Sequence, residues 1–517
     1  MSNARSDMET KPSAEKFWTS PRWLAVLLPV LFFVVALGIR LFDLTDPPND
    51  FYLVRQYRSM LIARGMYYEH LTTAPEWQRD IAVAQWKGEG LIEPPIMETV
   101  VALTYRLTGE HWWIGRVYVS LFWVLGGLAV LLLAREMMML EGGLVALAHY
   151  LFVYFGIIAS RAFQPDPLMV ALTAWALFAL YRWEMRRTWP MALWAGILTG
   201  LAILVKSVAV FPLLGAAAGL VLSRGAFKRS VGDKQVWCVA ALAALPTILF
   251  YIYGVFIVGT LGSQFALRFF PDMLLDPGFY ARWIEIAISV VDHWALLIAL
   301  VGVFLFRTRI QRGMAIGLWI GYLAYGLTFP YYFITHDYYH LPLIPIVSIG
   351  LIPAADLILH QLASQSKSWM WRAGFIGILF LGISVKVWDA RVTLVRQDYH
   401  HEIAYWQQLG DKIGHSTSVI ELSGDYGVRL AYFGWRDGSQ WASTADTKLR
   451  QLAGQSPPDF ASTFAEKTAG KDIFLITSLP ELENQTELQK YLTTHYTLID
   501  QGDGYLIFDL RHPLPAP

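Results

Sequence analysis

Two aspartates next to prolines are the residues best placed for acid–base chemistry. Asp50 follows Pro47-Pro48 in the sequence PPNDFYLVRQYR, and Asp166 stands in QPDPLM. Proline fixes the backbone torsion φ, so a carboxylate in such a loop is held in place and can serve as a general base. Aspartate is also a favoured N-cap, and proline suits the first helical turn. The pattern leaves both roles open for Asp50 and favours a cap for Asp166, with Pro167 at the first helical position.

Basic side chains that could bind a phosphate follow Asp50 and recur near residue 206. Arg55, Arg58 and Arg64 have the spacing of one helix face, and arginine binds phosphate through paired N–H groups. The same arginines could instead contact lipid headgroups. Lys206, in LVKSVAVFP, could bind a phosphate or simply extend its side chain to the membrane surface. These residues are candidates for holding an anionic substrate.

The most unusual polar cluster is the run His336-Asp337-Tyr338-Tyr339-His340. Two histidines and an aspartate could ligate a divalent metal. Alternatively, the tyrosines form the aromatic belt of a membrane interface and the histidines only donate hydrogen bonds. We assign no metal ligand from the sequence and expect no certain cofactor, with a divalent metal as the alternative. The chain lacks GxxxxGK[ST], GxSxG and DxD motifs, which argues against cytosolic nucleotide chemistry.

The composition indicates which elements must position these residues. Of the 517 residues, 55% are hydrophobic and only 16% are charged, whereas soluble proteins carry about 25% charged residues. This deficit places the chain among membrane proteins. The formal net charge is zero, so no basic field predicts a nucleic-acid partner. The single cysteine, Cys238, excludes an intrachain disulfide and a thiolate metal cluster.

Apolar runs predict about eleven transmembrane helices. One long run, 191–222, is the main ambiguity, because a single helix of that length would extend roughly 48 Å. The hydrocarbon core is only about 30 Å thick, so two short spans that meet near Lys206 fit better. The expected spans are 23–42, 117–134, 142–159, 167–181, 191–205, 207–222, 236–258, 287–306, 313–335, 341–359 and 373–388.

Charge placement supports this arrangement. With the N-terminus inside, seventeen Lys and Arg residues fall in inside segments and four in the short outside segments, as the positive-inside rule requires. We therefore expect a cytoplasmic tail at 1–22, a transmembrane domain at 23–388, and a first external loop at 43–116. Amphipathic stretches at 52–69 and 94–107 are expected to lie at the membrane interface.

The tail 389–517 is expected to form a small extracytoplasmic α/β domain. Short β-rich runs at 418–422, 473–477 and 505–510 alternate with helix-like stretches at 402–413 and 481–492. Two of the β-rich runs are flanked by Gly-Asp pairs. In this arrangement the acids and bases gather on one outer rim, as an active site for a charged, lipid-anchored substrate would need.

Five sequence segments, in this order, resemble a known family. They are the first loop ending RQYRSMLIARGMYY, then EPPIMETVVALTYRLTG, GRVYVSLFWVLGGL, the QPDPLM turn, and HDYYHLPLIP. Between about residues 20 and 390 the chain resembles the C-type (GT-C) membrane glycosyltransferases, specifically the bacterial family 39-like group. That group includes protein O-mannosyltransferases and aminoarabinose transferases of lipid A.

The resemblance implies a donor and roles for several residues. The family uses a polyprenyl-phosphate sugar from the outer face, with a first-loop acid as base, which corresponds to Asp50. Asp166 corresponds to the second functional acid. Some members place a lysine before the Pro-Ile of EPPI-like sequences to hold the donor phosphate, but this chain has Pro94 there. The phosphate role would then pass to Lys206, Arg55 and Arg58, with Glu93 as a helper.

The sequence thus predicts a mainly α, GT-C-type bundle that functions as an inverting glycosyltransferase of EC class 2.4. It would move a sugar from a polyprenyl-phosphate donor to an acceptor hydroxyl on a lipid, glycan or protein. We expect it in the bacterial inner membrane. The alternatives are a polyprenyl-linked lipid transporter or flippase, and a non-catalytic membrane partner whose external domain binds glycan.

Overall fold

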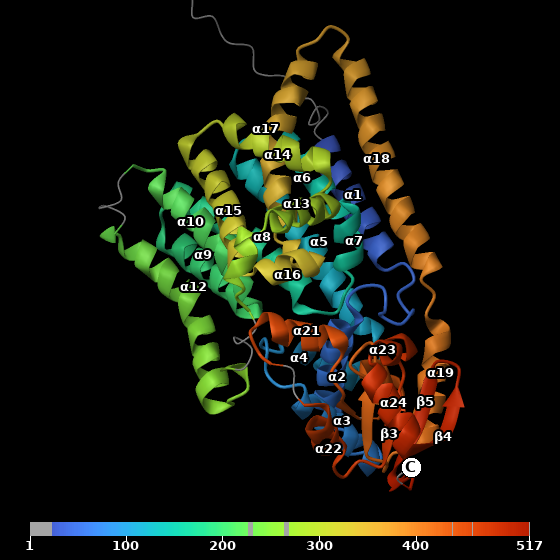
Figure 1. Ribbon diagram of the computed structural model, residues 1–517. Coiled ribbons are helices and arrows are strands. Elements are labelled where there is room, and N and C mark those ends of the chain that lie inside the picture. The colour runs from blue at the N-terminus through green and yellow to red at the C-terminus, as the bar shows by residue number, and fades with distance from the viewer. Residues whose placement is uncertain (1–22, 226–230, 263–267, 437, 457–458, 516–517) are drawn as a thin grey trace, which may run out of the picture.

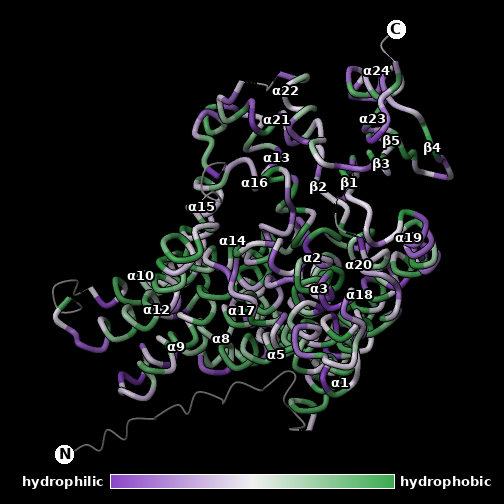
Figure 2. The backbone as a smooth tube through the Cα atoms, turned by 90° about the horizontal axis from the view of Figure 1, so that it is seen from below, coloured by the Kyte–Doolittle hydropathy of each residue, from purple (hydrophilic) through white to green (hydrophobic). Residues whose placement is uncertain are grey.

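The protein is mainly helical and carries a small mixed sheet near its C-terminus (Figure 1). The computed structural model describes residues 23–225, 231–262, 268–436, 438–456 and 459–515. The predicted cytoplasmic tail, 1–22, lies outside the described residues. Figure 2 shows that the bundle helices α8, α9 and α10 are hydrophobic along most of their length, whereas helices of the C-terminal part are largely hydrophilic.

Each of the eleven apolar runs falls on helical structure. Among the described residues, four helical stretches are long and apolar enough to cross a membrane alone, or five if one bent pair counts as a span. Several others are shorter than the ~20 residues a span needs. The bundle helices are α1 (Leu24–Arg40), α5 (Trp113–Glu136), α6 (Leu140–Phe152), α7 (Tyr154–Ala159), α8 (Pro165–Arg186), α9 (Trp189–Val205), α10 (Val210–Leu222), α12 (Lys234–Ile252), α13 (Pro277–Val291), α14 (His293–Leu305), α15 (Arg309–Thr328), α16 (Pro330–Thr335), α17 (Leu343–Ala363) and α18 (Ser368–Arg396).

The predicted break at Lys206 is present. Helix α9 ends at Val205, Lys206 has an extended backbone, and a 3₁₀ turn follows before α10. Lys206 pairs with Asp166 at the start of α8, and Arg224, after α10, pairs with Glu184 near the end of α8. Helices α9 and α10 therefore run in opposite directions along α8, as two spans would.

The run 287–306 is not one straight helix. Helices α13 and α14 meet at Asp292 with a bend of 98°. Asp292 has a φ of 73°, which stops the helix, and its carboxylate pairs with Lys386 of α18 at 2.9 Å. Apolar composition could not reveal this bend, because both arms are mainly apolar and read as a continuous run.

The segment 43–116, predicted to be the first external loop, contains three helices: α2 (Leu53–Tyr68), α3 (Glu76–Gly88) and α4 (Ile96–Thr108). Helix α2 packs against α3, α4 and α20, and nine of its residues are buried. It is therefore an internal helix rather than the surface-lying one that its amphipathic pattern predicted. Helix α3 was not expected from the sequence.

Arg64 joins α2 to the C-terminal region. Its guanidinium pairs with Glu110 at 2.8 Å, donates to the backbone oxygen of Tyr432, and lies 3.7 Å from the centre of the Tyr432 ring. It also lies over the Trp435 ring. Arg64 thus serves to hold the first loop against the C-terminal region instead of contacting lipid.

The C-terminal region forms a five-stranded sheet in the order β2-β1-β3-β5-β4. Strands β2, β1 and β3 are parallel, whereas β5 pairs antiparallel with β3 and β4. The three predicted strands form, β2 and β4 were missed, and the helix predicted at 481–492 is broken at Gln485. The elements are α19 (His400–Ile413), β1 (Val419–Leu422), α20 (Val428–Phe433), β2 (Gly438–Gln440), α21 (Thr444–Leu452), α22 (Phe460–Thr468), β3 (Ile473–Ile476), α23 (Leu479–Asn484), α24 (Thr486–His495), β4 (Tyr496–Gly502) and β5 (Tyr505–Pro513).

Glycines allow α10 and α15 to pack backbone to backbone. A Cβ atom on Gly219 would lie 2.0 Å from the carbonyl oxygen of Gly313, and one on Gly317 would lie 2.0 Å from that of Gly215. Small residues at such crossings are the usual means of close helix packing in membranes. No side chain fits without moving one of the helices.

We predict that Gly219→Leu lowers the free energy of unfolding by about 1–3 kcal/mol, because overpacking forces the two helices apart. Thermal unfolding in detergent measures the effect. The matched control is Gly377→Leu on α18, where a Cβ would meet nothing within 4 Å. Equal melting temperatures for the two variants would contradict the packing described here.

Candidate active site

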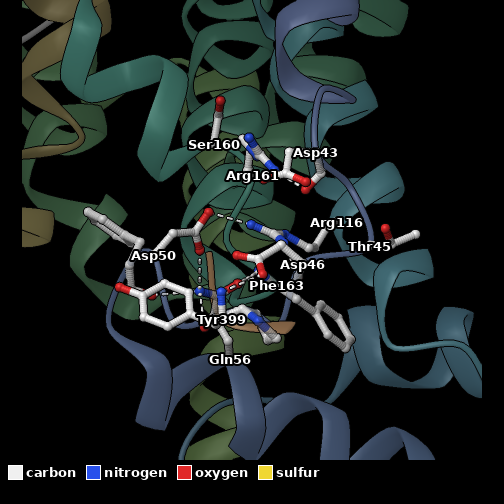
Figure 3. Close-up of polar contacts among 12 residues, drawn as sticks. Asp43, Thr45, Asp46, Asp50, Gln56, Arg116, Ser160, Arg161, Phe163 and Tyr399 are labelled. Carbon is white, nitrogen blue, oxygen red and sulfur yellow. Dashed lines mark hydrogen bonds and ion pairs between the residues drawn. The ribbon is translucent and has the colours of Figure 1, made fainter. Parts of the chain in front are cut away.

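Asp50 is held in a buried polar network just outside the end of α1 (Figure 3). Its Oδ2 pairs with Arg116 of α5, and its Oδ1 has a 3.5 Å contact with Gln56. Arg116 also donates to the backbone oxygen of Asp46 at 2.9 Å. The N-cap of α2 is Tyr52, with no side-chain capping bond, so the helix-cap alternative for Asp50 is wrong. Arg116 fixes one carboxylate oxygen and leaves the other only weakly engaged.

Asp166 is likewise not an N-cap. Helix α8 begins at Pro165 with Gln164 as its N-cap, so Pro167 is not the first helical position. Both oxygens of Asp166 lie 2.8 Å from the Nζ atom of Lys206, and both side chains are buried. Asp166 therefore pairs with Lys206 and does not cap the helix.

Lys206 opens onto a cavity of about 240 Å³ where cations converge. Three cationic side chains, Arg55, Lys206 and Arg268, line this cavity together with a single carboxylate, Glu93. Glu93 pairs with Arg55 at 2.6 Å. The lining therefore carries an excess of positive charge, as a phosphate site requires. The rest of the lining is mostly apolar and aromatic: Ile92, Pro94, Ile203, Leu204, Ser207, Val208, Thr247, Phe250, Tyr251, Leu261, Phe329, Tyr332, Tyr338 and Tyr339.

Protonation in this cavity reflects burial and the neighbouring charges. Burial lowers the pKa of Lys206, an effect that the Asp166 carboxylate opposes. Burial would raise the pKa of Glu93, but Arg55, Lys206 and Arg58 together bring it below the usual value. Glu93 is therefore a charged partner for Arg55 and a poor proton acceptor.

The two tyrosines of the HDYYH run face this cavity, and the histidines do not. The Lys206 ammonium lies 5.0 Å from the centre of the Tyr338 ring, and Arg268 donates to the Tyr339 hydroxyl at 3.2 Å. His340 is buried between the Tyr322 hydroxyl and the Phe333 carbonyl, so its role is structural.

His336 and Asp337 connect the run to the first loop. His336 stacks on Tyr52, with ring centres 5.9 Å apart, and the Asp337 N–H donates to the Tyr52 hydroxyl. Burial, with Lys206 and Arg55 nearby, lowers the pKa of His336 to about 4, so it is neutral at physiological pH. The Tyr52 ring also packs on Tyr338, 4.6 Å between centres, and thereby links the Asp50 loop to the cavity.

Asp50 itself is not part of the cavity lining, and neither is Arg58. Arg58 donates to the backbone oxygens of Glu89 and Gly90, which turns it toward the loop between α3 and α4. Sequence reasoning missed Arg268 as a cavity residue. Its one signal was its position as a rare cation in a segment expected outside.

The histidines of the HDYYH run do not form a metal centre with Asp337. Within the described part of the chain, the only group with suitable ligand spacing is Asp46, Asp398 and His400, whose ligand atoms lie within 4.8 Å of one another. The His400 Nδ1 atom lies 2.9 Å from Asp398 and 3.2 Å from Asp46. A divalent cation fits this donor set. A protonated imidazole that bridges the two carboxylates fits equally well.

Comparison with known proteins confirms the resemblance to the GT-C glycosyltransferases. Residues 92–253 match the family described as dolichyl-phosphate-mannose-protein mannosyltransferase. Apo ArnT from Cupriavidus metallidurans aligns at TM-score 0.57 and 15% identity, over 95% of this chain and 98% of ArnT. ArnT bound to undecaprenyl phosphate gives 0.58 and 14% over the same shares.

A more distant likeness extends to the oligosaccharyltransferase of Archaeoglobus fulgidus in its complex with Zn and sulfate. The TM-score is 0.51 at 11% identity, over 93% of this chain and 73% of that enzyme. No curated protein sequence matches the chain. The chain thus has the fold of ArnT.

We predict that Asp50→Asn destabilises the protein by about 3–5 kcal/mol, because it leaves the buried Arg116 without its counter-charge. Arg116→Gln should cost a similar amount. In the double variant the two amides can bond each other, so much of the stability should return. Thermal unfolding of all four proteins measures the coupling between the two residues. Strictly additive losses would contradict the pairing.

Proposed function

We propose that the chain is an inverting glycosyltransferase that uses a polyprenyl-phosphate sugar and acts at the outer face of the membrane. The observation that carries this proposal is the cavity in which Arg55, Lys206 and Arg268 converge beside Tyr338 and Tyr339. Three cations within one apolar-walled cavity match a phosphate on a lipid chain. The undecaprenyl phosphate bound by ArnT, which has this fold, supports the same class of donor here.

The cavity also explains how this chain manages without a lysine at position 94. Pro94 and Lys206 line the same cavity, so Lys206 can supply the charge from α9 that some relatives place in the first loop. Asp166 holds the Lys206 ammonium with both oxygens and so fixes its position before a ligand arrives. Arg55 is held by one oxygen of Glu93 at 2.6 Å.

The reaction would proceed by in-line displacement. The acceptor oxygen attacks the anomeric carbon, the bond from that carbon to the phosphate oxygen breaks, and polyprenyl phosphate leaves as an anion. Lys206, Arg55 and Arg268 stabilise the departing phosphate. Asp50 accepts the acceptor's proton through Oδ1, while Arg116 keeps its Oδ2 occupied.

The transferase fits better than a flippase. A transporter of inverted repeats would show broken helices in symmetric pairs near the midplane. In the described segments a single bent pair is found, α13 with α14. The cationic cavity instead lies where α9 gives way to the 3₁₀ turn at Ser207–Ala209.

We further propose eleven spans in a bacterial inner membrane, with the N-terminus inside and residues 389–517 outside. Helices too short to cross the membrane alone would cross it together with a neighbouring helix of the chain. The excess of Lys and Arg in alternate loops sets the orientation.

Cysteine labelling in intact cells tests this topology. In a Cys238→Ser background, Gln489→Cys on α24 should react with a membrane-impermeant maleimide, whereas Ser366→Cys, between α17 and α18, should react only after lysis. Both positions are exposed. The reverse pattern would refute the proposed orientation.

Loss of a cation should weaken donor use. We expect Lys206→Gln and Arg55→Gln to reduce donor affinity roughly 10–150-fold, the effect of a lost charged hydrogen bond of about 1.5–3 kcal/mol. Arg58→Gln is the matched control, because Arg58 lies on the same helix as Arg55 but does not line the cavity. This variant should retain near-normal affinity. Transfer from radiolabelled undecaprenyl-phosphate sugars to envelope extracts measures this. Wild-type affinity in both variants, or no transfer from any such donor, would overturn the proposal.

A further inference from the structure

A second cavity, of about 680 Å³, lies in the C-terminal region and shares no lining residue with the proposed donor site. Its size is that of a small-ligand site. It is lined by residues that follow β1 and β2 and by faces of α21, α22 and α24: Tyr426, Gln440, Trp441, Ala442, Thr444 and Asp446 form one part, and Arg450, Phe460, Lys467, Asn484, Gln485 and Glu487 another.

The sheet topology places this cavity where α/β folds bind ligands. The order β2-β1-β3 is parallel, and the chain leaves β1 toward β2 on one side before it returns as β3 on the other. Ligands of open α/β sheets bind outside the carboxyl ends of the strands at such a reversal. Tyr426 follows β1, Trp441 follows β2, and Asn484 lies in the segment after β3.

Tyr426 is presented to the cavity by an unusual backbone. Its φ is 57°, in the left-handed region that bulky side chains avoid, and its side chain is 50% exposed. Its hydroxyl donates to Asp446 at 2.9 Å, which fixes the ring at the cavity edge. Strained conformations of this kind cluster at active sites, ligand clamps and switch regions.

The rest of the lining offers hydrogen bonds in fixed positions. Gln485 accepts from the Trp441 indole at 2.8 Å and donates to Ala442 and Glu481, so its amide is rigid. Across the described residues, Arg450 and Lys467 form no ion pair, and both side chains are exposed. Aromatic rings suit a ligand with C–H faces, and the amides and cations beside them suit one with many hydroxyls.

The loop after β1 does not suit a nucleotide phosphate. Asp425 takes up the N–H of Gly427 at 3.1 Å and pairs with Arg429 at 2.6 Å. A phosphate site at this position would need those N–H groups free and no carboxylate among them. The cavity therefore lacks the phosphate site that other sheets of this topology have after the first strand.

The cavity lies next to the membrane part of the molecule. Helix α21 lies just below α16 in Figure 1, and Tyr426 is close enough to Tyr331 of α16 for their side chains to interact electrostatically. The neighbouring residue Tyr332 lines the donor cavity. A molecule held at Tyr426 would therefore lie near the mouth of the proposed transfer site.

From these features we infer that the C-terminal cavity binds the carbohydrate portion of the acceptor, with a sugar ring on Tyr426 and its hydroxyls on Asn484, Gln485 and Arg450. The acceptor is then a glycan or a glycan-bearing lipid. The role of the bound glycan as acceptor rests on the proposed function, but glycan binding itself does not require transfer.

A glycan-binding experiment without donor tests the inference. The detergent-purified full chain is applied to an array of neutral and acidic envelope oligosaccharides, and any hit is titrated by saturation-transfer NMR. Tyr426→Ala and Asn484→Ala should each weaken binding at least tenfold. Leu498→Ala, exposed on β4 and outside the cavity, is the control and should bind as the wild type does. Thermal unfolding confirms that each variant is folded.

The outcomes separate this inference from the proposed transferase. Glycan binding that depends on Tyr426 supports the cavity even if no transfer is detected. Transfer activity with no arrayed glycan retained, or with binding unchanged in both cavity variants, overturns the cavity while the transferase stands. Retention of a peptide or a vesicle instead of any glycan would also overturn it.

Discussion

The arrangement of the proposed donor site depends on a buried ion pair between Lys206 and Asp166. A buried lysine is costly unless it pairs with a carboxylate. Here both oxygens of Asp166 lie 2.8 Å from the Lys206 ammonium. The pair joins the beginning of α8 to the end of α9. The pair therefore fixes the cation at the helix break and in the wall of the cavity.

A second set of contacts holds the segment 43–116 between the bundle and the C-terminal region. Asp46 accepts the N–H of Tyr399 at 2.8 Å, and Arg116 binds both Asp50 and the Asp46 backbone. Arg64 fastens α2 to Tyr432. The loop that carries the proposed base is thus fixed at both ends. A base fixed in this way needs little reorganisation when an acceptor arrives.

Much of the fold could be predicted because apolar composition marks each bundle helix and charge placement marks the break at Lys206. The bend at Asp292 could not, since composition shows neither the positive φ of Asp292 nor its pairing with Lys386, which lies 94 residues away in the sequence. In the C-terminal region the buried strands β1 and β3 were visible as apolar runs. The three-residue β2 and the exposed β4 carry no such pattern.

The candidate site was predictable in its residue types but not in its pairings. Lys206, Arg55, Glu93, Tyr338 and Tyr339 do share one cavity. Capping propensity suggested a local role for Asp166 and left one open for Asp50, but the carboxylates pair with Lys206, at the end of α9, and with Arg116 on α5. Arg58 was expected on the same helix face as Arg55, yet its guanidinium donates to the backbone oxygen of Gly90.

The central claim is that the cavity around Lys206 holds a lipid phosphate. The most direct test is a cryo-EM structure of the protein in lipid nanodiscs with undecaprenyl phosphate. The account predicts phosphate density within hydrogen-bond distance of Lys206 and Arg55, with the lipid chain leaving between the apolar walls. Phosphate density elsewhere, for instance against Arg116 and Arg161, or an empty cavity at saturating lipid, would contradict it.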